Sequence, residues 1–138
     1  MNPKSFILFL FVFFVSCTPA DYCDTINNEI KKCQTIVYKT LTDNTEKTLY
    51  TKSLQQLHSS EKRIKKLGDY RGEKELLNTA TTLIQFYKTT LENHHKENYP
   101  NYETFLIDFK EQEHGLIVDF QNAYHSFIKN FDLIQSQL

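Results

Sequence analysis

Apolar residues recur at three- and four-residue intervals along most of this chain, and this spacing is what most limits its possible folds. Such spacing puts apolar side chains on one face of an α-helix, whereas a half-buried strand would alternate at every second residue. The pattern is clearest in the middle of the chain, at Leu76, Leu77, Ala80, Leu83, Ile84, Tyr87 and Leu91. Only three Gly and three Pro are present, which leaves few turn signals for a sheet protein. The sequence therefore predicts long helices.

The first two helices have recognisable ends. The first is expected at residues 19–40, because Thr18 is a good N-cap and Pro19 suits the first helical position. The second follows a polar break at residues 42–45. It ends at Gly68, since glycine readily takes the left-handed conformation that closes many helices.

The last two helices are separated by a proline. The third is expected to start after residues 69–72 and to end before Pro100, which disfavours helical geometry in the residue that precedes it. Asn101 can cap the fourth helix, which is expected from residue 102 nearly to residue 138. That segment is either one helix longer than the others or a helix bent near Gly115. Its extra length is expected to project past the bundle or to pack on another molecule.

Four amphipathic helices with short connections can bury their apolar faces only together. The expected fold is all-α, an antiparallel up-down four-helix bundle with a long C-terminal helix. An array of helical hairpins with an extended fourth helix is the alternative.

The first seventeen residues, MNPKSFILFLFVFFVSC, have the composition of a targeting segment. Lys4 precedes an apolar run of ten residues, which is shorter than the ~20 residues of a membrane-spanning helix. The run has the length of the apolar region in a secretory signal peptide. Val15, Ser16 and Cys17 follow, and this ending resembles the lipobox of bacterial lipoproteins, where the cysteine is acylated and cleavage occurs just before it.

The lipobox resemblance implies a lipoprotein signal peptide at residues 1–16 and a mature chain that is lipid-anchored through Cys17. Residues 17–138 are then the helical-bundle domain that the apolar stripes predict. Phe14 and Val15 depart from the common Leu-Ala pattern. Cleavage after Ala20 with secretion of an unlipidated protein is one alternative, and retention of the apolar segment as an anchor is another.

Charge and the residue after the cysteine bear on location and partners. Removal of residues 1–16 takes away one basic residue, Lys4, and leaves 15 basic and 17 acidic residues, a net charge of −2. This near balance argues against a nucleic-acid partner, which would require a basic excess. Thr18 is not an aspartate-type inner-membrane retention signal, which favours the outer membrane of the bacterial cell envelope. The membrane, reached through the N-terminal lipid, and an envelope protein are the expected partners.

A second resemblance covers about a third of the chain. A leucine-rich helix with Leu54 and Leu57 leads into the turn LGDYRGE at residues 67–73, and the next helix carries the segment IQFYK at residues 84–88. These segments resemble a family of small helical bacterial surface or envelope lipoproteins of unknown function. The resemblance implies a lipoprotein and a helical bundle; it supplies no activity and no catalytic residues.

Motifs for catalysis and cofactors are absent from the sequence. There is no nucleophile elbow, phosphate-binding glycine loop or zinc-protease motif, and no Cys-x-x-Cys-His for covalent haem. One group of possible metal ligands, His58, Glu29 and His114, is expected at the same level along the bundle axis. These three side chains could bind one divalent ion on the flank of the bundle. Three solvent-exposed polar residues are the alternative interpretation. We expect no enzyme activity and no cofactor.

Cysteine and tyrosine residues offer a few further candidates. Cys23 and Cys33 are ten residues and ~15 Å apart in one predicted helix, too far to form a disulfide. Cys33 falls on the apolar face, whereas Cys23 lies near its edge and could pair with another chain. Tyr99 and Tyr102 flank Pro100, where they either form an aromatic patch for a partner or close the end of the bundle.

Taken together, the sequence predicts a non-enzymatic, lipid-anchored envelope protein whose bundle has a structural or partner-binding role. The alternative is a periplasmic or secreted four-helix bundle that binds a small ligand or a metal.

Overall fold

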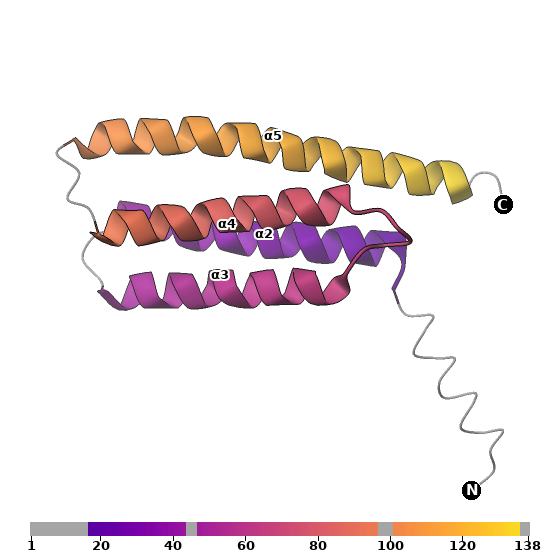
Figure 1. Cartoon of the computed structure of the whole chain (residues 1–138), viewed down its shortest axis with the longest axis horizontal. Helices are drawn as coiled ribbons and strands as arrows, with labels where there is room; N and C mark the ends of the chain where they lie inside the picture. The colour runs from indigo at the N-terminus through magenta and orange to yellow at the C-terminus, as the bar shows by residue number, and fades with distance from the viewer. Residues whose placement is uncertain (1–16, 44–46, 97–100, 136–138) are drawn as a thin grey trace, which may run out of the picture.

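The computed structural model describes residues 17–43, 47–96 and 101–135. This part of the chain forms four helices, α2 (Pro19–Thr42), α3 (Lys47–Leu67), α4 (Glu75–Lys96) and α5 (Tyr102–Gln135), and contains no strand. Successive helices run in opposite directions (Figure 1). The predicted all-α up-down bundle with a long C-terminal helix is confirmed. The predicted signal peptide lies outside the described residues.

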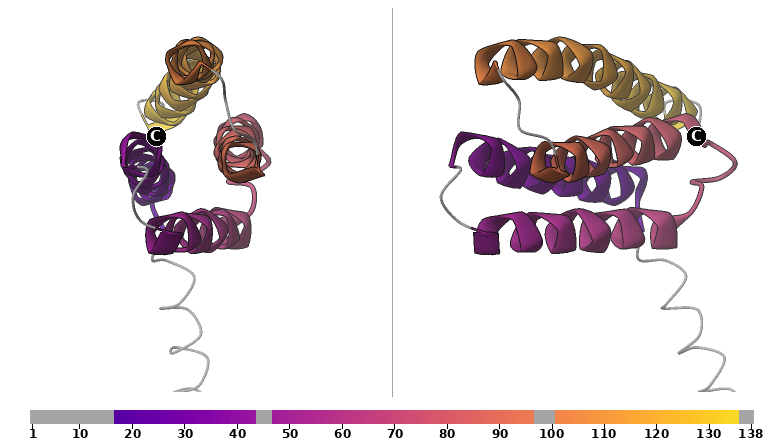
Figure 2. Two further views of the ribbon diagram at one scale, coloured as in Figure 1. Left: turned by 90° about the vertical axis from the view of Figure 1, so that its left-hand side faces the viewer. Right: turned by 60° about the vertical axis from the view of Figure 1, so that its left-hand side comes forward.

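The four helices form a diamond in cross-section (Figure 2, left). Helices α2 and α4 pack against each other across the centre, and each of them also contacts both α3 and α5. Helices α3 and α5 occupy the two outer edges and do not touch. Any site that needs side chains from both α3 and α5 is therefore disfavoured by the packing.

Local signals set the start of α2 as the sequence predicts. The Thr18 hydroxyl accepts a hydrogen bond from the backbone N–H of Asp21 at 3.1 Å, and the Asp21 carboxylate accepts one from the N–H of Thr18 at 3.2 Å. This reciprocal pair is a capping box. The helix continues to Thr42, two residues beyond its predicted end, and the N–H of Asp43 still bonds to the Lys39 carbonyl at 3.0 Å.

The connection between α3 and α4 is a tight turn. Gly68 has φ +63°, as predicted, and Gly72 has φ +84°. Tyr70 and Glu73 exchange backbone hydrogen bonds of 3.2 and 3.0 Å across the turn. The Glu73 carboxylate then accepts hydrogen bonds from the first N–H groups of α4, including that of Glu75 at 2.9 Å. These contacts fix the turn at the end of the bundle where α2 begins (Figure 1).

Helix α5 is one continuous helix through Gly115 and is longer than the other three, and it curves along its length (Figure 2, right). Its C-terminal end extends past the other three helices (Figure 1), which is one of the two outcomes expected from the sequence. Before that end, Phe127 and Phe131 pack on Tyr70 of the α3–α4 turn, with ring centroids 5.7 and 5.0 Å away. The turn protrudes from the bundle end, and the last turns of α5 cover it.

The hydrophobic core draws on all four helices and lies within residues 22–131. Its largest fully buried side chains are Tyr22, Tyr87, Phe127, Ile26, Leu41, Leu57, Ile64, Leu76, Leu83, Ile84, Leu91 and Val37. The stripe predicted on α4 is buried at almost every position. A chain that begins at Cys17 contains every residue of this core.

Candidate functional site

The predicted attachment point, Cys17, lies at one end of the bundle. It is exposed and precedes the N-cap of α2 directly. The hydroxyl of Tyr70 donates a hydrogen bond to the Cys17 carbonyl at 3.2 Å, which ties this residue to the α3–α4 turn. A lipid on Cys17 would therefore be joined to a fixed point on the bundle, without a linker between them.

An aromatic cluster underlies this end. Tyr22 packs on Tyr70 and Phe127 with ring centroids 5.1 and 5.3 Å apart, and its hydroxyl donates to the Gly68 carbonyl at 2.8 Å. Burial, and next the nearby Glu73 carboxylate, raise the pKa of Tyr22 to about 12. The cluster joins α2, the α3–α4 turn and the end of α5, so the surroundings of Cys17 are rigidly supported.

The two remaining cysteines are buried and free. Both lie in the unbroken helix α2, so the prediction that they do not pair with each other is confirmed. The suggested intermolecular role of Cys23 is not supported, because its side chain is only 2% exposed. Burial raises the pKa of the Cys23 thiol, and raises that of the Cys33 thiol to about 11. Both behave as small core residues.

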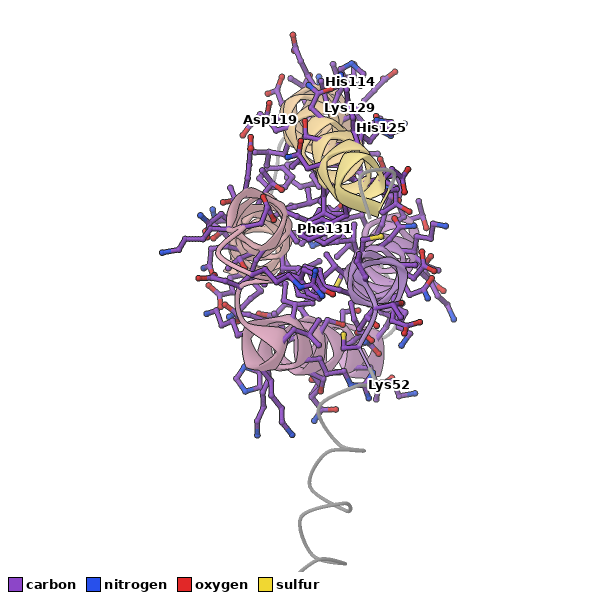
Figure 3. All side chains as sticks on the ribbon, turned by 90° about the vertical axis from the view of Figure 1, so that its right-hand side faces the viewer. Lys52, His114, Asp119, His125, Lys129 and Phe131 are labelled. Atoms are coloured by element: carbon purple, nitrogen blue, oxygen red, sulfur yellow. The ribbon has the colours of Figure 1, made fainter. Side chains whose placement is uncertain are left out.

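The weak metal set predicted from the sequence is not assembled. His58 is exposed on α3 and His114 is exposed on α5, at opposite edges of the diamond, while Glu29 is buried between α2 and α3. Figure 3 shows His114 pointing away from the bundle. No three His, Cys, Asp or Glu side chains are placed to hold one ion within the described residues. The alternative of three exposed residues is wrong for Glu29.

Glu29 instead ties α2 to α3. Its carboxylate accepts hydrogen bonds from the Ser60 hydroxyl at 2.7 Å, from Arg63 at 3.0 Å and from Lys32 at 2.9 Å. Burial opposes ionisation here, but these hydrogen bonds outweigh it and hold the pKa of Glu29 below its usual range. The buried Glu29 carboxylate is therefore compensated by hydrogen bonds and opposite charge.

Glu61 ties α3 to α4 in a similar way. Lys65 of its own helix and Lys88 of α4 approach its two oxygens at 2.7 and 2.8 Å. The hydrogen bonds from Lys65 and then Lys88 lower the pKa of Glu61. The sequence already places Glu61 on the apolar stripe of α3, but its partner on α4 is not visible there.

Glu113 is the third buried carboxylate, and it differs because the hydrogen bonds recorded for it come from neutral groups. It is 3% exposed on α5 and accepts hydrogen bonds from the Tyr38 and Tyr87 hydroxyls and from the Gln34 amide, the last two at 2.5 and 3.3 Å. Burial and this carboxylate together raise the pKa of Tyr38 to about 12, and they raise that of Tyr87 further. The cluster joins α5 to both α2 and α4.

Sequence reasoning missed Glu29 and Glu113 as buried groups. The signal that was present is helical spacing: Glu113 follows the core residue Phe109 by four and precedes Phe120 by seven. Glu29 sits between the core residues Ile26 and Ile30. A charged residue on such a stripe indicates burial or a snorkelling side chain, and only the fold decides between the two.

The outcome differs between Tyr99 and Tyr102, the two tyrosines considered as a partner site. Tyr99 lies outside the described residues. Tyr102 is half-buried, donates a hydrogen bond to the Leu41 carbonyl and lies 5.5 Å from both His94 and Phe105 between ring centroids. Tyr102 therefore closes the end of the bundle, which was one of the two interpretations from sequence.

Comparison of the chain with protein-family models, curated proteins and solved structures finds no match. The resemblance to envelope lipoproteins accordingly stays a prediction. In the described part of the chain, no helix has both the length and the hydrophobicity needed to cross a bilayer.

Proposed function

We propose that this protein is a non-enzymatic, lipid-anchored component of the bacterial cell envelope that acts as a structural or partner-binding module. In this proposal residues 1–16 are removed as a signal peptide and Cys17 carries the lipid at the outer membrane. The observation that carries the proposal is the position of Cys17. It is exposed, it directly precedes the N-cap of α2, and its carbonyl accepts a hydrogen bond from Tyr70 of the α3–α4 turn.

The interior supports a binding or structural role over catalysis. The three buried glutamates bond to groups on neighbouring helices, and each of them ties two or three helices together. Groups that are engaged in this way stabilise the bundle and fix the rotation of its helices. What this leaves for recognition is the outer surface of the bundle.

Intact mass spectrometry of protein extracted from native membranes tests the anchor. The expected mass is that of a chain starting at Cys17 with attached acyl groups, and Cys17→Ser should lose both the acyl mass and membrane association. Cys33→Ala is the matched control, because its thiol is buried and should carry no lipid. An unlipidated chain that starts at Asp21 would overturn the proposal and make this a secreted bundle.

A further inference from the structure

The two outer edges of the diamond carry opposite charge. Helix α3 has six Lys or Arg residues and one Glu, a net charge of +5, whereas α5 has six Asp or Glu and two Lys, a net charge of −4. Helices α2 and α4 are each neutral overall, with three and two charges of each sign. Because α3 and α5 do not touch, these charges do not neutralise one another within one molecule.

A groove lies on the basic side, between α2 and α3. Its volume is about 570 Å³, and we call it the lysine groove. Three lysines of α2, Lys31, Lys32 and Lys39, line it together with Ile36 and with Gln56 of α3. No acidic side chain is among its described lining residues. Because Lys32 is already paired with Glu29, the positive charge that the lysine groove offers comes mainly from Lys31 and Lys39, and Ile36 adds an apolar contact point.

The complementary feature is on the outer face of α5. Ile107 and Val118 are the two large hydrophobic side chains of the described structure that are most exposed, at 59% and 38%. They lie eleven residues apart, about three turns, and so share one face. Exposed Asp108 and Glu111 lie beside them, and Asp119 points away from the bundle in Figure 3. We call these five residues the acidic stripe.

The lysine groove and the acidic stripe lie at the same height along the bundle. Helices α2 and α5 are antiparallel neighbours (Figure 1). On the inner face of α5, Glu113, which is level with the middle of the stripe, bonds to Gln34 and Tyr38, which lie within the stretch of α2 that carries the groove. The stripe extends over residues 107–119, about 18 Å, and the groove over residues 28–39 of α2, about 16 Å. Two molecules side by side with parallel axes would bring stripe and groove together at full length.

We propose that the acidic stripe of one copy docks in the lysine groove of the next, so that the protein associates side by side with itself. The contact joins two different surfaces, and it is therefore heterologous and continues into a row or a closed ring. Lysines face carboxylates across it, and Ile107 and Val118 are covered. This inference names a partner for the proposed partner-binding module and rests on that part of the proposed function.

The similar height of the stripe and the groove along the bundle axis matters if the protein is anchored in a membrane. Parallel axes at equal height place the Cys17 ends of all copies on the same side of the assembly. Every copy can then hold its lipid in one membrane without tilting. The interface itself involves no residue near Cys17, so its test does not depend on lipidation.

The test uses the chain 17–138 with Cys17→Ser, which retains the whole core and carries no lipid. Analytical ultracentrifugation compares about 0.1 M with about 1 M salt, where the Debye length falls from about 10 Å to about 3 Å. The expected result is concentration-dependent assembly at the lower salt and a monomer at the higher. A monomer at both, over all accessible concentrations, would overturn the proposal.

Charge reversal locates the interface. Lys31→Glu with Lys39→Glu should weaken assembly about tenfold or more, as should Asp108→Lys with Glu111→Lys, because like charges would then face each other. Combining all four changes in one chain should restore assembly. Lys62→Glu with Lys66→Glu, on the neighbouring basic helix α3 and outside the groove, is the control and should leave assembly unchanged.

Two results would contradict the interface. One is equal weakening by the Lys62 and Lys66 control, which would indicate a general charge effect. The other is a wild-type monomer that sediments with phosphatidylglycerol vesicles through Lys31 and Lys39, which would assign the groove to an anionic membrane surface. Circular dichroism of each variant confirms that its helices are intact. If the protein does not assemble but Cys17 is acylated in cells, only the proposed self-association is rejected, and the proposed lipid anchor is retained.

Discussion

The hydroxyl of Tyr87 lies 2.5 Å from a carboxylate oxygen of Glu113, in the interior where α4 meets α5. Tyr87 is fully buried and Glu113 is nearly so. A buried carboxylate without hydrogen-bonding partners would be strongly unfavourable, so the phenols of Tyr87 and Tyr38 and the Gln34 amide set the rotation of α5 against the other helices. This contact also fixes which face of α5, and hence which side chains, point outward.

Tyr87→Phe should lower the free energy of unfolding by roughly 2 kcal/mol, since hydrogen bonds to charged groups contribute about 1.5–3 kcal/mol. Urea denaturation followed by circular dichroism measures the loss. Tyr102→Phe is a matched control, because it removes a hydroxyl that donates to the neutral Leu41 carbonyl and should cost only about 1 kcal/mol. A Tyr87→Phe loss no larger than that of the control would contradict a stabilising role for the Tyr87–Glu113 hydrogen bond.

Stability should fall at alkaline pH because of the same tyrosines. The pKa of Tyr38 rises from 10.0 to about 12, mainly through burial and next through Glu113. The folded protein thus keeps a proton that the unfolded chain loses, so the stabilisation is complete below pH 10 and is lost between pH 10 and 12. Tyr87, whose pKa is raised further, continues the decline.

Urea midpoints measured from pH 8 upward test this expectation. The variant with both Tyr38→Phe and Tyr87→Phe should show a shallower decline than the wild type above pH 10. The comparison separates these tyrosines from Cys33, whose thiol pKa is raised to about 11 and adds its own loss. Parallel curves for the two proteins would show that neither phenol titrates with a raised pKa.

Thiol accessibility should distinguish the three cysteines in unlipidated protein. Cys17 is exposed, whereas Cys23 and Cys33 are buried and have raised thiol pKa values. A thiol-specific reagent should therefore modify one cysteine quickly in the folded protein and all three in urea, and Cys17→Ser should abolish the fast reaction. Fast modification of Cys23 would mean that the first turns of α2 open away from α5.

Helix boundaries were predictable because they depend on a few neighbouring residues. The Thr18 cap, the left-handed Gly68 and the Asn101 cap, which accepts from the N–H of Thr104 at 3.2 Å, all operate within a few positions of the chain. The apolar stripes then favoured an antiparallel bundle over the alternative array of helical hairpins. Local chemistry thus determined most of the fold.

The interior carboxylates could not be predicted in the same way. Glu113 bonds to Tyr38 and Tyr87, which are 75 and 26 positions away, and Glu29 bonds to Ser60, 31 positions away. These contacts depend on the rotation of each helix about its axis, which a stripe defines only to within about one residue position. The flank site from His58 and His114 failed for a different reason: it depends on which helices are neighbours, and the diamond cross-section keeps α3 and α5 apart.

Substitution by alanine should change the free energy of unfolding in opposite directions at two glycines, Gly115 and Gly68. Gly115 lies within helix α5 with open space where a Cβ would stand, so Gly115→Ala should stabilise the fold by about 0.5–1 kcal/mol. Gly68 also has open space there, but its φ of +63° strains any residue that carries a Cβ, and Gly68→Ala should destabilise by about 1–2 kcal/mol. Urea midpoints at high salt, where any assembly is suppressed, provide the comparison. Destabilisation by Gly115→Ala would instead show that α5 is bent or opened at this position in solution, and a neutral Gly68→Ala would show that the α3–α4 turn adopts another conformation.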